Sequence, residues 1–398
     1  MPVHHRAGAV MAALLSLSAS SQAIITVLLR LHADSKASQA ATRDIEDAIT
    51  AHIMDLSLKQ RLLRARPHQG GQRITSDWLL DLDDRECLWT FRFTASEIFH
   101  LCDALTIPMI IKTKSGYKFP RVEALCLLLA RMRDSGDAYR MTMLYNRCQS
   151  SISEIFNELV IYVDRTWSPL LTFNTNGVLA PECLAEYAEA VHEYGAPLTG
   201  IWGFIDCTIR HICRPSHFQR AAYNGYKKYH ALKYQAVLLP NGIIGHLYGP
   251  VEGRRNDNAL LADSGLLDWC REHAIRPDVP PDAPPAQRFL QIYGDPAYGV
   301  SFQIMSGYHG LGERTEEELE FNYAMSRARM AVEDIFGLIL ANWPFLNAFW
   351  KMKVESSPVG RYYRIGVLLT NAMNCLRPNT VATRFDVLPP SLEDYFNV

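Results

Sequence analysis

Between residues 94 and 171, apolar residues recur at helical spacing and are interrupted by short polar turns, which predicts at least four helices. The boundaries of three are clear, at 121–133, 138–145 and 150–163. Helices of this size joined by tight turns suit either a helix-turn-helix unit or an ordinary helical bundle that packs against the next domain. A helix-turn-helix unit would offer three side chains of its last helix to a DNA groove, namely Ser151, Ser153 and Asn157. We favour the bundle.

After Trp202 the pattern changes to short apolar runs bounded by turn residues. It predicts four strands, at 203–212, 229–239, 243–248 and 289–293, the second and third joined by a tight hairpin turn at 240–242. Helical spacing occupies three further stretches, at 260–273, 316–343 and 362–376. Three antiparallel strands, a helix, a further strand and then helices are the element order of a ribonuclease-H-like α/β domain. We therefore expect a mixed sheet with flanking helices, preceded by a helical N-terminal region.

These patterns divide the chain into four parts. They are a helical or poorly ordered appendage and linker at 1–75, a helical region with the helix-turn-helix candidate at 76–195, the α/β domain at 196–380 and a tail at 381–398. The small apolar run at 9–17 suits a signal peptide or an N-terminal helix, and the helix is favoured because the apolar pattern resumes at 24–31. Because no run of about 20 apolar residues occurs, we expect no membrane span.

Composition and charge are those of a folded globular protein, with 48% hydrophobic and 21% charged residues among 398. The 40 basic and 42 acidic side chains give a net charge of -2, so any polyanion site must be a local patch. The number of cysteines is 9, which is odd, and no Cys-x-x-Cys pair occurs. This argues against a disulfide framework and a zinc knuckle, and it indicates a reducing compartment.

Three acidic residues occupy positions that call for a specific role. Asp206 lies inside an apolar strand, where an ionised carboxylate is costly unless it is paired or binds a metal. Asp295 follows the fourth predicted strand at its carboxyl end, where open α/β sheets place their ligands. Glu333 belongs to a polar ridge beside the apolar stripe of its helix. Each alone is more often a solvated or salt-bridged group, but in this order of elements the three predict one site.

Such a site would be rich in oxygen ligands and poor in His and Cys, which selects Mg²⁺ or Mn²⁺ over zinc. Two such ions about 4 Å apart can activate a water or a 3'-hydroxyl and stabilise the leaving oxygen in phosphodiester displacement. Asp257, just past the third predicted strand, is a further candidate metal ligand. Its alternative role is that of a turn residue that bonds its own backbone.

Residues 201–260 contain 8 basic side chains against 3 acidic ones, a local excess of 5 in an acidic protein. Tyr223, Tyr226 and Tyr229 interleave aromatic surface, and this combination suits a phosphate backbone. A solvated basic face is the alternative. The residues predicted to bind DNA are Arg210, Arg214, Lys227, Lys228, Lys233, Arg254, Arg255 and Arg329.

Six sequence blocks occur in a fixed order: IDCT at 205–208, YNGYKKYHALKYQ at 223–235, PNGII at 240–244, GPVEGRRND at 249–257, GDPAY at 294–298 and FNYAMSRARMAVE at 321–333. They resemble the PIF/Harbinger transposases and the nucleases derived from them, within the DDE endonuclease superfamily. LLTN at 368–371 looks like the closing helix of that family. The resemblance covers about residues 200–376, and six blocks in order make it specific.

The resemblance implies that Asp206, Asp295 and Glu333 are the catalytic metal-binding triad and that Asp257 is a further acidic ligand. It also implies two divalent ions, Mg²⁺ or Mn²⁺, as cofactors, a nuclear location and a separate Myb-like DNA-binding partner. Two positions depart from the family pattern, because Cys207 stands in place of a small Gly and Asn256 in place of a His. Neither change removes a carboxylate, though either could lower activity.

We therefore expect a divalent-metal-dependent DNA endonuclease or transposase of the DDE type. One alternative is a domesticated, transposase-derived DNA-binding or scaffold protein without catalysis, which an absence of Mg²⁺-dependent nicking would favour. Another is a nuclease that acts on RNA, which matched DNA and RNA substrates would separate. The sequence leaves open the target site, the metal used in cells and whether the chain forms a homo-oligomer.

Overall fold

The computed structural model describes residues 50–52, 54–55, 69–277, 279–310 and 312–397. The chain divides into two units, residues 1–68 and residues 69–398. Most of the predicted appendage at 1–75, including the apolar run at 9–17, lies outside the described residues. None of the helices in the described ranges is long and apolar enough to cross a membrane.

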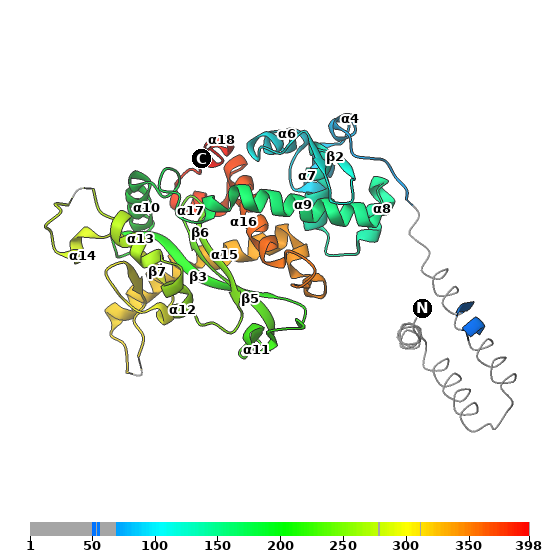
Figure 1. Cartoon of the computed structure of the whole chain (residues 1–398). Coiled ribbons are helices and arrows are strands. Elements are labelled where there is room, and N and C mark those ends of the chain that lie inside the picture. The colour runs from blue at the N-terminus through cyan, green and yellow to red at the C-terminus, as the bar shows by residue number, and fades with distance from the viewer. Residues whose placement is uncertain (1–49, 53, 56–68, 278, 311, 398) are drawn as a thin grey trace, which may run out of the picture. The chain divides into compact units, whose positions relative to one another are not determined.

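The first part of the larger unit is helical, with a small two-stranded sheet (Figure 1). Its elements are α4 (Ser76–Leu80), α5 (Asp84–Phe91), α6 (Ala95–Ala104), β1 (Ile110–Lys112), β2 (Lys118–Pro120), α7 (Arg121–Arg133), α8 (Ala138–Tyr145), α9 (Gln149–Trp167), the 3₁₀ turn η1 (Ser168–Leu171) and α10 (Pro181–Glu193). The helices predicted at 121–133 and 138–145 are confirmed as α7 and α8. The third, α9, continues four residues beyond the predicted end, because its buried stripe of Leu159 and Val163 extends to Trp167.

The polar side chains of α9 are held by the protein itself. Ser151 is 1% exposed, and its hydroxyl donates a 2.8 Å hydrogen bond to the carbonyl of Cys148. The amide oxygen of Asn157 accepts a 2.7 Å hydrogen bond from the hydroxyl of Tyr362. Ser153 is exposed. Two of the three side chains that a helix-turn-helix unit would offer to DNA therefore face protein partners, and α9 has the packing of a bundle helix.

A six-stranded mixed sheet follows in the chain. Its strands are β3 (Ile201–His211), β4 (Tyr223–Asn224), β5 (Tyr229–Leu238), β6 (Ile244–Glu252), β7 (Gln291–Gly294) and β8 (Ile304–Ser306). β5 pairs antiparallel with β3, β4 and β6, whereas β7 pairs parallel with β3 and β8. Gly242, at a φ of 81°, supplies the left-handed residue of the predicted turn between β5 and β6. The predicted fold class, a ribonuclease-H-like mixed sheet, is confirmed.

Helices flank this sheet (Figure 1). They are α11 (Gln219–Ala222), α12 (Asp257–Asp263), α13 (Leu266–His273), α14 (Pro285–Arg288), α15 (Glu316–Asn342), α16 (Val359–Leu376), α17 (Thr380–Phe385) and α18 (Leu392–Tyr395), with 3₁₀ turns η2 (Pro296–Tyr298), η3 (Pro344–Asn347) and η4 (Phe349–Lys351). The prediction of one helix over 260–273 is wrong, since α12 and α13 are separated at Gly265, whose φ is 68°. This left-handed backbone conformation, which Gly adopts more readily than other residues, ends the first helix.

The helical region and the sheet share one hydrophobic core. Phe156 of α9 packs edge-on against Phe345 of η3 at a ring-centroid distance of 5.3 Å. The buried carboxylate of Asp164 accepts two hydrogen bonds from the Arg364 guanidinium of α16, at 2.6 and 2.8 Å. These contacts fix α9 on α16, and α16 in turn packs on β6. Helices that precede the sheet in the chain and helices that follow it therefore pack together beside the sheet.

Candidate active site

Asp206 lies in the middle of β3, directly opposite Ala236 of β5. Because successive strand residues point to opposite faces, Asp206 shares its face with Thr208 and Arg210, whereas Cys207 points to the other face. The Asp206 side chain is 21% exposed, and its Oδ1 accepts a 2.7 Å hydrogen bond from the backbone N–H of Cys207. Burial raises the pKa of this carboxyl to about 6. A charged group this poorly solvated is costly to the fold.

Arg329 joins the strand carboxylate to the helix carboxylate. Its Nη1 lies 3.5 Å from Oδ2 of Asp206, and its Nη2 donates a 2.7 Å hydrogen bond to Oε1 of Glu333. Arg329 and Glu333 are four residues apart on α15, the spacing that places two side chains on one helix face. The predicted polar ridge of this helix therefore faces β3. Glu333 keeps 55% of its side chain exposed, so the site is open to solvent.

Asp295 follows β7, the parallel neighbour of β3. Phe204 pairs with Tyr293, and extending this register by two residues brings Asp295 beside Asp206 on strands about 4.8 Å apart. The Oδ1 of Asp295 accepts a 2.9 Å hydrogen bond from the N–H of Ala297, which caps η2 and fixes the turn. The negative charges of Asp295 and Glu333 both contribute to the raised pKa of Asp206. The structure thus places the three predicted carboxylates near enough to interact electrostatically.

Asp257 lies on the other face of the sheet. It is the first residue of α12 and forms an ion pair with Lys233 of β5. Lys233 is paired in register with Ile209, which shares the face of Cys207 rather than that of Asp206. The ammonium of Lys233 also donates a 3.0 Å hydrogen bond to the carbonyl of Arg255. The structure therefore does not join Asp257 to the other three carboxylates.

The two departures from the family pattern have structural roles near Asp257. The thiol of Cys207 lies 3.2 Å from the hydroxyl of Tyr298, so this larger side chain fills space between β3 and η2. Asn256 caps α12, because its side-chain oxygen accepts a 2.8 Å hydrogen bond from the N–H of Ala259. Asn is among the most favourable residues at that position. Neither side chain lies on the face of the sheet that carries Asp206 or alters its place in β3.

The resemblance implies a metal ion, which would need closely grouped ligands of suitable chemistry. Within the described ranges, no group of three or more His, Cys, Asp or Glu side chains is gathered closely enough to hold a metal ion. The oxygen donors of Asp206, Asp295 and Glu333 are nevertheless those that Mg²⁺ and Mn²⁺ prefer. The Arg329 guanidinium already lies between two of them as a shared cation. These residues fit a hard cation in ligand type and in charge, with Arg329 in competition for the same carboxylates.

Four of the predicted DNA contacts have exposed side chains, namely Arg214, Lys227, Lys228 and Arg254. Arg254 and Arg255 line an open pocket of about 410 Å³ beside the start of α12. Lys227 and Lys228 lie at the turn between β4 and β5. These positions form a solvent-facing basic surface on the hairpin side of the sheet.

The other predicted contacts are engaged within the protein. Arg210 donates a 2.5 Å hydrogen bond to the Thr208 hydroxyl and lies 5.3 Å from the ring centroid of Tyr363. Lys233 is 6% exposed, and Arg255 forms an ion pair with Asp263. The charge of Lys233 therefore faces Asp257 rather than solvent, although the sequence pattern counts it with the exposed cations.

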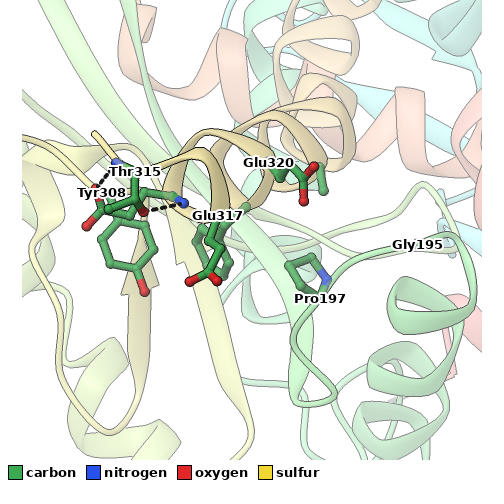
Figure 2. Close-up of a pocket in the computed structure, with 9 residues that line it drawn as sticks. Gly195, Pro197, Tyr308, Thr315, Glu317 and Glu320 are labelled. Carbon is green, nitrogen blue, oxygen red and sulfur yellow. Dashed lines mark hydrogen bonds between the residues drawn. The ribbon is translucent and has the colours of Figure 1, made fainter. Parts of the chain in front are cut away.

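A separate pocket of about 620 Å³ lies at the first turn of α15. Figure 2 shows Glu317 of this turn beside Thr315 and Tyr308, and Glu320 of the next turn near Pro197. The pocket contains none of the predicted site residues, and its carboxylates oppose the approach of phosphate. Acidic side chains at a helix N-terminus complement the helix dipole, which accounts for them structurally.

Sequence reasoning identified Arg329 as a DNA contact but missed its role as the link between Asp206 and Glu333. The signal was present, because an Arg four residues before a Glu on a helix indicates an ion pair. The second contact, from Arg329 to Asp206, depends on how α15 packs on β3, which spacing along the chain does not reveal.

Comparison with known proteins gives one match. The family model of the DDE superfamily endonucleases matches residues 205–371. The matched segment begins one residue before Asp206, ends at Asn371 and includes Asp257, Asp295 and Glu333. No curated protein and no solved structure matches the chain. The similarity is thus to a family of endonucleases, over the segment that contains the three assembled carboxylates.

Proposed function

We propose that this protein cleaves or transfers phosphodiester bonds in DNA with the help of two divalent metal ions, as a DDE-type nuclease of the PIF/Harbinger kind. One observation carries the proposal. Asp206 and Glu333 share the Arg329 guanidinium, and Asp295, just past the end of the adjacent strand, acts electrostatically on Asp206, all within a segment similar to DDE superfamily endonucleases.

Each residue has a defined part in this proposal. Asp206, Asp295 and Glu333 would hold the ions through their carboxylate oxygens. Bound ions supply an activated water or 3'-hydroxyl and stabilise the leaving oxygen of the phosphodiester. Arg329 would compete with the ions for the oxygens of Asp206 and Glu333. A guanidinium released from them would be able to bind a DNA phosphate through two parallel N–H groups.

The substrate assignment to DNA rests on the exposed basic surface at Arg214, Lys227, Lys228 and Arg254. Such cations supply affinity for a phosphate backbone by releasing condensed counterions. The proposal includes a nuclear location and a separate Myb-like DNA-binding partner, both of which rest on the family resemblance alone.

Nicking of supercoiled DNA with and without Mn²⁺ tests the proposal. Asp295→Asn and Glu333→Gln should each lose cleavage by far more than about tenfold while DNA binding survives, because each removes a charge that the ions require. Glu320→Gln is the matched control, since this exposed carboxylate lies on the same helix outside the site. Cleavage by both site variants within about tenfold of the unmodified protein would refute the two-metal hypothesis.

One observation favours a second candidate, a domesticated DNA-binding or scaffold protein without catalysis. Arg329 supplies Asp206 and Glu333 with a cation from the protein itself. Thermal unfolding with Mn²⁺ separates the two candidates, because a ligand that binds only the folded state raises the midpoint. A midpoint unchanged by Mn²⁺, together with intact DNA binding, would favour the non-catalytic protein.

A further inference from the structure

The end of the β3–β5 hairpin and the neighbouring η4 carry large aromatic side chains in solvent. Phe218 and Tyr226 are each 86% exposed, and Trp350 is 54% exposed. Phe218 precedes α11, Tyr226 lies in the turn between β4 and β5, and Trp350 is the middle residue of η4. We call these three residues the aromatic platform. Large exposed apolar side chains on neighbouring segments mark an interaction site.

The two segments that carry the platform are bound to each other. The backbone N–H groups of Ser216 and His217 both donate to Oε1 of Glu355, at 2.6 and 3.2 Å. The N–H of Cys213 donates a 3.0 Å hydrogen bond to the carbonyl of Met352. The ring of His211 stacks on that of Phe349 at a centroid distance of 4.0 Å. Segments far apart in the sequence therefore form one surface.

The turn that carries Tyr226 is also fixed. The amide of Asn224 donates a 2.7 Å hydrogen bond to the carbonyl of Gly253, and its oxygen accepts one of 2.8 Å from the N–H of Lys227. The ammonium of Lys227 lies 5.2 Å from the centroid of the Tyr226 ring. A ring held in place before binding loses little conformational entropy on contact.

Phe218 has an unfavourable backbone conformation as well as an exposed ring. Its φ of 55° and ψ of 28° lie in the left-handed region, which bulky residues rarely adopt. Residues in such regions cluster at binding and catalytic sites, where strain is tolerated for function. An exposed and strained Phe gains nothing for the fold that a small polar residue would not supply better.

Charge identifies the class of ligand. The segments 213–230 and 349–355 contain 6 cations and 1 acid, and that acid, Glu355, is occupied by the backbone of Ser216 and His217. The cations are Arg214, Arg220, Lys227, Lys228, Lys351 and Lys353, of which Lys351 donates a hydrogen bond to the carbonyl of Gly136 and the other five are exposed. A ligand with both flat apolar faces and many negative charges is a nucleic acid with unpaired bases, because pairing and stacking hide the base faces in a duplex.

We propose that the aromatic platform stacks unpaired bases of a DNA strand whose phosphates lie on the surrounding cations. This inference rests on the proposed function for its choice of DNA. His211, at the end of β3, follows Asp206 by five residues, which is roughly 16 Å along a strand. The platform therefore holds bases several nucleotides from the bond at the carboxylates.

Fluorescence anisotropy in EDTA tests this with a labelled single-stranded oligonucleotide and the fully paired duplex of the same sequence. Phe218→Asn, Tyr226→Ala and Trp350→Ala should each weaken single-strand binding about five- to tenfold and duplex binding less than about twofold. Asn is chosen at 218 because it tolerates the left-handed backbone. Tyr139→Ala, a 47% exposed aromatic on α8, is the matched control and should change neither.

Tyr226→Phe should bind as the unmodified protein does, because it keeps the ring. Equal losses for both DNA forms, or no loss for either, would overturn the platform. A larger loss for the matched RNA strand would overturn the assignment to DNA. EDTA removes cleavage from the readout, so an inactive protein with the expected binding pattern contradicts the nuclease alone, whereas an active protein without it contradicts the platform alone.

Discussion

Replacement of Asp206 by Asn should stabilise the fold while it abolishes cleavage. Burial raises the pKa of this carboxyl from 3.8 to about 6, even though Arg329 acts in the opposite direction. A shift of about two units at about 1.4 kcal/mol each corresponds to about 3 kcal/mol of destabilisation once the carboxyl is ionised. Because the folded state binds this proton more tightly than the unfolded state, the penalty is absent below about pH 4 and develops as pH rises to about 6.

Asn is nearly isosteric with Asp and keeps an oxygen for the 2.7 Å hydrogen bond from the N–H of Cys207. It carries no charge that must be desolvated, and the lost attraction to Arg329 is already included in the net pKa shift. We therefore expect Asp206→Asn to increase the free energy of unfolding by about 2 to 3 kcal/mol at pH 7.5. The difference should shrink as pH falls toward 4.

Urea unfolding at several pH values, each with and without Mn²⁺, measures both effects. Mn²⁺ should stabilise the unmodified protein and have little effect on the variant, because the variant lacks a ligand. Glu320→Gln, an exposed change on α15, should stay within about 0.5 kcal/mol. A variant that is less stable than the unmodified protein at neutral pH and keeps the same response to Mn²⁺ would refute this account of Asp206.

Three further predictions concern other charged groups. Burial lowers the pKa of His246 from 6.5 to about 4, so the fold should lose up to about 3 kcal/mol as pH drops across that interval, and urea unfolding of His246→Phe should lack this slope. Asp257→Asn should lower the free energy of unfolding by about 3 kcal/mol, because it leaves the buried ammonium of Lys233 unpaired. Its Mn²⁺ dependence of cleavage should change less than in the triad variants, and an unchanged Mn²⁺ titration would leave Asp257 with a structural role only. Joint replacement of Lys227 and Lys228 by Ala should weaken binding to any DNA sequence and reduce the salt dependence of log K by about two, and an unchanged slope would contradict their contact with phosphate.

Long elements with a strong pattern could be predicted from the sequence. β5, predicted at 229–239, ends one residue earlier, and α15 begins at its predicted residue. Two features could not be predicted. β8 has only three residues and exists because it pairs with β7, which no local pattern records. The break at Gly265 was missed because a single Gly within a helical pattern is usually tolerated.

For the candidate site too, features marked by a local pattern could be predicted and those that depend on strand pairing could not. Asp206 stands out because a carboxylate interrupts an apolar strand, Asp295 because it follows a strand at its carboxyl end, and Glu333 because it belongs to a polar ridge beside an apolar helix stripe. The position of Asp257 was not predictable, since the face on which its partner Lys233 lies follows from the register between β3 and β5. A shift of that register by one residue would have reversed the faces. Side-chain pairing across a sheet is therefore the information that spacing along the chain lacks.

The contacts of α9 with α16 bear on how this molecule can be divided or recombined. A fragment starting at residue 196 would lose Asp164, which binds Arg364, and Phe156, which covers Phe345. Arg364 would lose the carboxylate that balances its charge, and Phe345 would lose the ring packed on it. The helices before the sheet are therefore part of the same folded body as the sheet, so a transfer of either part to another protein would have to carry both.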